Sequence, residues 1–185
     1  VAGGTDPVRV VFMGRLHPKK GVLPLARAWL ASELANLAGF ELVIIGNDDG
    51  ELADLKRILH NQPINIRYVE PVYGQDKFDI LNTCTYFVLP SESEGFPVAL
   101  IESMAVGLIP MISNGCNLPE AFQENIAIRL SPIEGDIREA LNRILEKSPG
   151  ERKALREQIR LFVQRRFSLE KNADQQARLY HSLID

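Results

Sequence analysis

Two glutamates, Glu94 and Glu102, stand eight residues apart in a segment that is otherwise mostly apolar. Glu94 follows a polar turn, whereas Glu102 lies inside the apolar run 98–106. An unpaired carboxylate inside a buried helix is costly, so Glu102 needs a cation or a set of hydrogen-bond donors. Two interpretations are open. Glu102 is either part of a structural ion pair or near the surface, or it accepts hydrogen bonds from a ligand's hydroxyl groups together with Glu94.

A loop near the start of the chain carries the opposite charge. Arg15, Lys19 and Lys20 lie within six residues, between Gly14 and Gly21. The loop follows a short apolar run and precedes a helical pattern, and phosphate groups bind readily where a helix begins. Two interpretations are open. The loop is either a solvated basic loop, which is common, or a loop that binds an anion such as phosphate.

The elements around the glutamates are a strand, a helix and a second strand. The apolar run 86–89 ends in a polar turn, as a buried strand does. Pro97 suits the first position of a helix and Gly107 suits its end, after which the apolar run 108–112 follows. A helix that is hydrophobic on all sides is normally buried, so we expect 98–106 to be enclosed. The unit predicts a parallel pair of strands with a right-handed crossover.

The same alternation continues along the chain. Further strands are expected at 9–13, 40–45, 64–69 and 125–130, and helices at 23–37, 51–59, 75–82, 119–123, 133–147, from 149, and from 168. This order predicts an α/β fold, a Rossmann-like doubly wound parallel sheet of about six strands with C-terminal helices. Ligands of such sheets bind beyond the carboxyl ends of the strands. The candidate residues follow successive strands in that position: Arg15 and Lys20, then Gly46, Val72, Glu94 and Gly115.

Composition and charge exclude other classes of function. The net charge of −3 gives no basic footprint for nucleic acid. Cys84 and Cys116 are too few for a disulfide framework, and Cys84 is expected to pack as a small hydrophobic residue. Asp48 and Asp49 precede a helix and are expected to cap it, not to bind a metal. No apolar run is long enough to cross a membrane, and we expect a cytoplasmic protein.

The segment from Glu94 to Glu102 resembles the Glu-x7-Glu motif of retaining nucleotide-sugar glycosyltransferases with the GT-B architecture. The strand ending in Leu-Pro-Ser before it and the Glu-Ser-Met-Ala-x-Gly segment that follows strengthen the resemblance. The segment from Gly14 to Gly21 is similar to the Gly-Arg-Leu-x-x-x-Lys-Gly segment of the same family, which includes sucrose synthase and bacterial mannosyltransferases. The resemblance extends over about 10–184 but covers only the donor-binding half of such an enzyme.

The resemblance implies roles for particular residues. Arg15 and Lys20 would hold the diphosphate of the donor, Glu94 would bind the transferred sugar, and these three form the predicted catalytic set. Glu102 would accept hydrogen bonds from the ribose. The remaining predicted substrate-binding residues are Gly14, Gly46, Val72, Gly95, Phe96, Pro97, Val98, Gly115 and Glu120.

Two loops depart from the family pattern. The chain has Gly-Asn-Asp-Asp-Gly at 46–50 where relatives commonly have Gly-Asp-Gly, and Gly115 precedes a cysteine where relatives have a second glycine. Glu120 has two interpretations of equal weight: it lies beside the diphosphate and sugar, or it only opens the helix at 119–123.

The resemblance also implies how the whole protein works. The donor is a UDP-, GDP- or ADP-sugar, with no cofactor and no metal ion, and the acceptor site belongs to an N-terminal GT-B domain outside this chain. Residues 1–8 are expected to be a linker remnant, 9–167 the nucleotide-sugar-binding domain, and 168–185 a helix that packs toward the N-terminal domain. We expect a role in cell-envelope polysaccharide synthesis, with peripheral membrane association of the full-length protein left open, and no transfer by this piece alone. The alternatives are a non-catalytic nucleotide-sugar-binding or regulatory module and a GT-B sugar-nucleotide epimerase.

Overall fold

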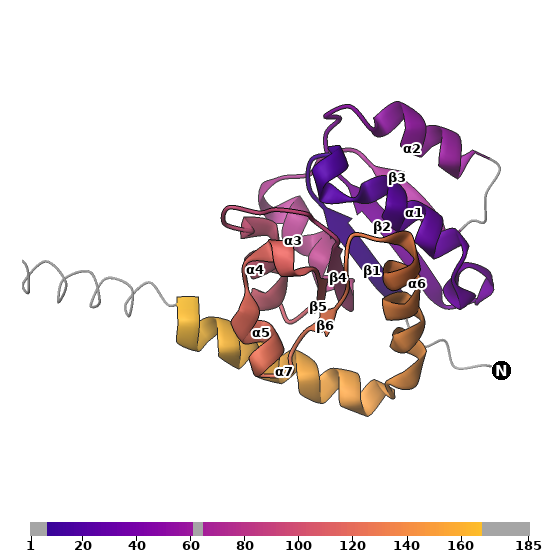
Figure 1. Ribbon diagram of the computed structural model, residues 1–185. Coiled ribbons are helices and arrows are strands. Elements are labelled where there is room, and N and C mark those ends of the chain that lie inside the picture. The colour runs from indigo at the N-terminus through magenta and orange to yellow at the C-terminus, as the bar shows by residue number, and fades with distance from the viewer. Residues whose placement is uncertain (1–6, 61–64, 168–185) are drawn as a thin grey trace, which may run out of the picture.

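The computed structural model describes residues 7–60 and 65–167, so the expectations for the first residues and for a helix from 168 lie outside it. Within these ranges the chain forms a six-stranded parallel sheet in the order β3-β2-β1-β4-β5-β6 (Figure 1). The strands are β1 (Val8–Met13), β2 (Phe40–Ile45), β3 (Ile66–Val69), β4 (Tyr86–Leu89), β5 (Ile109–Ile112) and β6 (Ile128–Arg129). The predicted Rossmann-like fold is confirmed.

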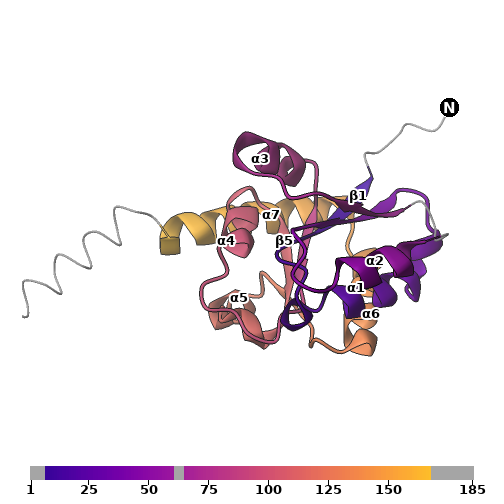
Figure 2. The ribbon, with the colours of Figure 1, turned by 90° about the horizontal axis from the view of Figure 1, so that it is seen from above.

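Helices cover both faces of the sheet (Figure 2). They are α1 (Val22–Leu30), α2 (Leu52–Leu59), α3 (Gly74–Asn82), α4 (Val98–Ala105), α5 (Pro119–Gln123), α6 (Glu134–Asn142) and α7 (Pro149–Phe167). One face carries α1, α2 and α6, and the opposite face carries α3, α4 and α7. None of the helices in the described ranges is both long and apolar enough to cross a membrane.

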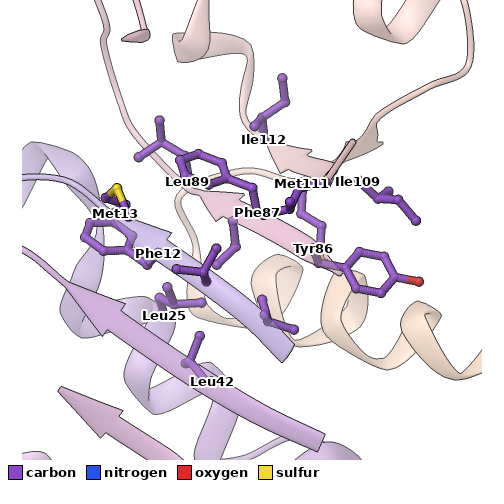
Figure 3. Packing of buried hydrophobic residues seen from close by; sticks show 14 of the residues in the cluster. Phe12, Met13, Leu25, Leu42, Tyr86, Phe87, Leu89, Ile109, Met111 and Ile112 are labelled. Carbon is purple, nitrogen blue, oxygen red and sulfur yellow. The ribbon is translucent and has the colours of Figure 1, made fainter. Parts of the chain in front are cut away.

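The central strands β1, β2, β4 and β5 are largely buried on both faces, which is why their sequences are mostly apolar. β1 is paired with β2 along its whole length, from Val8 opposite Phe40 to Met13 opposite Ile45. The side chains of Phe12 and Phe87 fill the centre of the core (Figure 3). A parallel sheet built in this way places the carboxyl ends of its strands, and the loops that follow them, at one edge.

Two predicted helices end earlier than expected. The helix predicted over 23–37 stops at Leu30, because the Ser32 hydroxyl donates to the Trp29 carbonyl oxygen at 2.7 Å and competes with the helical pattern. The helix predicted over 133–147 stops at Asn142, whose side-chain oxygen accepts from the Glu33 amide at 3.1 Å. Short 3-10 turns, Glu33–Asn36 and Arg143–Glu146, complete both segments.

The capping box predicted at the start of α7 is confirmed. The Ser148 amide donates to the Glu151 carboxylate at 2.8 Å, and the Glu151 amide donates to the Ser148 hydroxyl at 3.3 Å. Hydrogen bonds from Ser148 also hold the pKa of Glu151 below its usual value. Two otherwise unpaired amides are thereby satisfied, which fixes where this long helix begins.

The expectation that α4 is buried on every face is wrong. Leu100 and Met104 are fully buried, but Val98 exposes 55% of its surface and Glu102 is only half-buried. The helix turns one side toward the core, while its first turn is exposed at the edge where the strands end. Pro97 occupies the N-cap, one position before the helical residue that was expected.

Candidate functional site

The centre of the site is the point where the strand order reverses. β1 and β4 are neighbours in the sheet, and the chain winds outward from them in both directions. Open α/β sheets bind ligands at this position. Here the ammonium group of Lys20, from the loop after β1, lies 2.6 Å from both carboxylate oxygens of Glu94, from the loop after β4. Both side chains are largely buried, with 18% and 8% of their surface exposed.

Backbone contacts hold these two loops together. The Glu92 amide and the Ser91 hydroxyl both donate to the Lys19 carbonyl oxygen, at 2.8 and 3.1 Å. Gly21 has a φ of 71°, and a Cβ atom there would lie 2.6 Å from the Pro90 carbonyl oxygen. Only glycine fits such a position without displacement of the backbone. These contacts between the loops after β1 and β4 therefore hold Lys20 close to Glu94.

The loop after β5 supports Glu94 from the other side. The Glu94 amide donates to the Gly115 carbonyl oxygen at 2.7 Å, and the Asn117 side-chain amide donates to the Glu94 carbonyl oxygen. A Cβ atom on Gly115 would lie 2.4 Å from the Glu92 carbonyl oxygen. Sequence reasoning missed Asn117, although its type is one of the few that tolerate the left-handed φ of 52° it adopts.

A close approach of two glycines joins the loops after β1 and β2. The Gly14 amide donates to the Ile45 carbonyl oxygen at 3.0 Å. An added Cβ atom on Gly46 would lie 1.8 Å from the Gly14 carbonyl oxygen, which no side chain could tolerate. Both glycines line the cavity described below. Their small size brings backbone, without side chains, to the face of that cavity.

The two aspartates at 48 and 49 have different roles. Asp48 accepts hydrogen bonds from the Leu52 and Gly50 amides, which cap α2 and hold the pKa of Asp48 below its usual value. Asp49 instead pairs with the exposed Arg15 guanidinium at 2.7 Å. The capping interpretation is confirmed for Asp48. No group of three metal-ligating side chains occurs in the part of the chain that the structure describes.

Glu102 has the cation that its position demands. The Lys77 ammonium, from α3, lies 2.6 Å from the Glu102 carboxylate, and both side chains are partly exposed. The interpretation of Glu102 as a half-exposed ion pair is therefore correct. Its ligand-binding role stays a prediction. That role is compatible with the ion pair, because Glu102 also lines a cavity. Lys77 was not predicted, since nothing in its spacing relates it to Glu102.

Two adjoining cavities lie along this edge of the sheet. The smaller, about 180 Å³, is at the first turn of α4, and its lining includes Gly14, Lys20, Glu94, Phe96, Pro97 and Leu100. The larger, about 310 Å³, has a lining that includes Arg15, Gly46, Val72, Tyr73, Lys77 and Glu102. Met13, Gly14, Val98 and Ala99 line both. The two cavities therefore share part of their walls, and we call them together the trough; Lys20 lines the smaller, and Arg15 and Lys77 line the larger.

Most of the predicted residues line this trough, but three lie elsewhere. Gly95 and Gly115 shape the loop that carries Glu94 and do not line either cavity within the described ranges. Glu120 opens α5 and pairs with Arg166 of α7. The Phe96 ring, 63% exposed, meets Phe167 edge to face at 6.2 Å, which brings the end of α7 to the start of α4.

The cysteines take no part in the site. Cys84 and Cys116 are both buried with free thiols, and the expectation that Cys84 packs as a small hydrophobic residue is confirmed. Burial raises the pKa of the Cys116 thiol to about 11. Because the thiolate is the nucleophile, a buried thiol with a raised pKa is poorly suited to nucleophilic chemistry.

Comparison with known proteins assigns the family. Residues 3–180 match the model of the family described as glycosyl transferases group 1. The chain belongs to this family. It is 34% identical over 156 residues to the amylovoran biosynthesis glycosyltransferase AmsK of Erwinia amylovora, an alignment that covers 79% of this chain and 37% of that protein.

Two further comparisons are consistent with this assignment. The chain is 32% identical over 133 residues to the UDP-Gal:alpha-D-GlcNAc-diphosphoundecaprenol alpha-1,3-galactosyltransferase of Escherichia coli, covering 68% of this chain and 34% of that enzyme. The crystal structure of the C-terminal domain of the group 1 protein LpcC from Francisella tularensis superposes with a TM-score of 0.74 at 18% identity and 89% coverage of both chains. The chain thus has the fold of that C-terminal domain, and it spans about a third of the length of its curated relatives.

Proposed function

We propose that this chain is the donor-binding domain of a retaining glycosyltransferase, which moves a hexose from a nucleotide-diphosphate sugar to a sugar, lipid or polysaccharide acceptor. The observation that carries the proposal is the meeting of Lys20 and Glu94 at the switch point, beside the first turn of α4. A cation, a carboxylate and a helix N-terminus in one small cavity suit a ligand that has both phosphate and hydroxyl groups.

In this proposal the diphosphate lies between Lys20, which lines the smaller cavity, and Arg15, which lines the larger one. Arg15 and Lys20 bind its oxygens, together with amides of the first turn of α4. Lys20 is paired with Glu94, so a phosphate group must take over part of that contact. Two fixed cations stabilise the charge that develops on the leaving diphosphate, which is the task a metal ion performs in other transferases.

The two glutamates bind the two sugars of the donor. Glu102 accepts from the hydroxyl groups of the ribose in the larger cavity, and Glu94 accepts from hydroxyl groups of the transferred hexose. The leaving phosphate receives the proton of the acceptor, so no residue of this chain serves as general base. Retention of anomeric configuration comes into the proposal from the family motif alone.

Transfer requires the rest of the protein. The chain spans about a third of its curated relatives, and we place the acceptor site in the part outside it. The 185-residue chain then binds the donor but does not transfer sugar by itself. One of the relatives is named for a UDP-galactose donor, which makes UDP the first nucleotide to test.

Calorimetric titration of the 185-residue chain with UDP, GDP and ADP tests the proposal. We expect saturable binding of one nucleotide and a loss of about tenfold or more in affinity for Arg15→Ala, the usual effect of removing a charged hydrogen bond. Arg138→Ala is the matched control, because Arg138 is an exposed arginine of α6 away from the trough. It should leave affinity unchanged.

The alternative is a non-catalytic module in which the glutamates are structural. The ion pairs of Glu94 with Lys20 and of Glu102 with Lys77 are the contacts such a module would keep. Absence of nucleotide binding in both this chain and the full-length protein would favour the module and reject the proposed function.

A further inference from the structure

Lys77 holds the second glutamate of the site. It belongs to α3, which follows β3, whereas Glu102 belongs to α4, 25 residues further along the chain. The ammonium group contacts one carboxylate oxygen, Oε1, at 2.6 Å. Oε2 has no hydrogen-bond partner among the described residues and stays available to a ligand.

We infer that Lys77 is a positioning residue: it fixes the Glu102 carboxylate against the ribose hydroxyls and so makes binding depend on those hydroxyls. The inference rests on the proposed function and adds a residue to it. An ionised carboxylate can accept about four hydrogen bonds. One strong donor on Oε1 therefore fixes the orientation of the group without using up its capacity.

The surroundings of Lys77 limit its movement. Its ammonium group lies 4.9 Å from the centre of the neighbouring Phe78 ring, within the range of a cation–π contact. Only 20% of the Lys77 side chain and 28% of the Glu102 side chain are exposed. Attraction between charges is stronger at a partly buried site than in open solvent. The pair is thus held in place before a ligand arrives.

The position of Lys77 separates this role from phosphate binding. Lys77 lines the larger cavity with Gly46, Val72 and Tyr73, at the end assigned to the nucleoside. The smaller cavity at the first turn of α4 has Lys20 as its cation, and Lys77 does not line it within the described ranges. The proposed function assigns the diphosphate to Lys20 and to Arg15, whose partner is Asp49, and it assigns the ribose to Glu102, whose partner is Lys77.

The test compares a nucleotide with its hydroxyl-deficient counterpart. The 185-residue chain and Lys77→Met are titrated with the nucleoside diphosphate that binds the wild type and with its 2′,3′-dideoxy analogue. We expect Lys77→Met to lose about tenfold in affinity for the natural nucleotide, the scale of one charged hydrogen bond, and less than about twofold for the analogue. Loss of discrimination between the two ligands is the specific readout.

Four further measurements make the comparison decisive. Glu102→Ala should show the same loss, and Lys77→Met combined with Glu102→Ala should lose no more than either change alone, because the two groups act as a unit. Lys77→Arg keeps the charge and should retain most of the discrimination. Lys153→Met removes an exposed lysine of α7, at the opposite edge of the sheet, and should change nothing.

The possible failures are distinguishable. An equal loss for both ligands in Lys77→Met would mean a phosphate contact or a general structural role, and no loss would mean that Glu102 needs no support; either result overturns the inference. If the wild type, as this chain and as the full-length protein, binds none of the three nucleotides, the proposed function fails first and the inference fails with it.

Discussion

Lys20 and Glu94 lie 74 residues apart in the chain and meet with 2.6 Å between the ammonium group and each carboxylate oxygen. Their contact spans the two strands at which the sheet reverses its order. Arg15 with Asp49 and Lys77 with Glu102 form further ion pairs along the same edge. Each of these pairs thus places a cation beside a carboxylate at this edge, where phosphate groups could contact the cations and hydroxyl groups could contact the carboxylates.

Glu94→Ala should slow sugar transfer by the full-length protein. Loss of a hydrogen bond to a charged group costs about 1.5–3 kcal/mol, which predicts a decrease of about tenfold to 150-fold in kcat/KM. Steady-state assays with the nucleotide sugar chosen by the binding experiments measure the effect. Glu92→Ala is the control, because Glu92 is an exposed carboxylate of the same loop. Transfer by Glu94→Ala at the wild-type rate would remove Glu94 from the mechanism.

Gly46→Ala should destabilise the fold. The new methyl group would stand 1.8 Å from the Gly14 carbonyl oxygen, so the loops after β1 and β2 must separate. We expect a loss of about 3 kcal/mol or more in the free energy of unfolding, measured by urea denaturation. Gly135→Ala is the matched control, since Gly135 is a helical glycine with open space around its Cα. That change should be neutral or slightly stabilising. Equal stability of the two variants would contradict the close approach.

Local patterns predicted the sheet well because few kinds of sequence are compatible with a strand buried on both faces. The bounds 40–45 and 86–89 agree with β2 and β4, since each is an apolar run that a polar turn ends. The prediction that the candidate residues lie at one edge of the sheet followed from the parallel order of the strands alone. The ends of α1 and α6 were missed because Ser32 and Asn142 bind backbone groups that the sequence does not associate with them.

Partners of charged groups could not be predicted from spacing. Glu102 clearly needed a cation, yet Lys77 lies on another helix and only the packing of α3 beside α4 brings it there. Asp49 looked like a cap beside Asp48, but the return of the loop after β1 gives it Arg15 instead. The exposure of Val98 was also missed, because the sequence does not distinguish an apolar residue at the exposed edge of the sheet from one in the core.

Glu41 should make stability depend on pH. Burial opposes its ionisation, but hydrogen bonds from Arg67 and Arg9, at 2.6 and 2.7 Å, outweigh that effect and hold the pKa of Glu41 below its usual value. A lowered folded-state pKa adds stability that is complete above the usual value near 4.5 and is lost as the pH falls through the folded-state value. The two arginines join β1 and β3 to β2 through this one carboxylate.

Glu41→Gln removes that dependence. We expect the variant to be less stable than the wild type by about 1 kcal/mol or less at pH 7, because the pairs are partly solvated, and the difference should shrink below about pH 4. Urea denaturation at a series of pH values measures both quantities. Arg57→Gln, at an exposed ion pair within α2, serves as a control with little effect at neutral pH. A stability gap that widens in acid would contradict the assignment.

Tyr86→Phe should stabilise the protein. Tyr86 is fully buried in β4, and its hydroxyl group has no hydrogen-bond partner among the described residues. Figure 3 shows that hydroxyl pointing away from the labelled apolar side chains. Burial raises the pKa of Tyr86 to about 12, although the Arg152 guanidinium, which lies near the hydroxyl but outside hydrogen-bond geometry, opposes the shift. The group therefore stays neutral, and its burial is a cost that phenylalanine avoids.

The expected gain for Tyr86→Phe is about 1 kcal/mol in the free energy of unfolding, the lower end of the cost of a buried polar group without a partner. Tyr68→Phe is the matched comparison. The Tyr68 hydroxyl donates to the Gly46 carbonyl oxygen at 3.0 Å, so its removal should cost about 1 kcal/mol. Opposite signs for the two variants would confirm that only one hydroxyl is bonded. A loss in both would mean that the Tyr86 hydroxyl has a hydrogen-bond partner. Arg152 is the nearby candidate, and such a bond would help to hold α7 against the sheet.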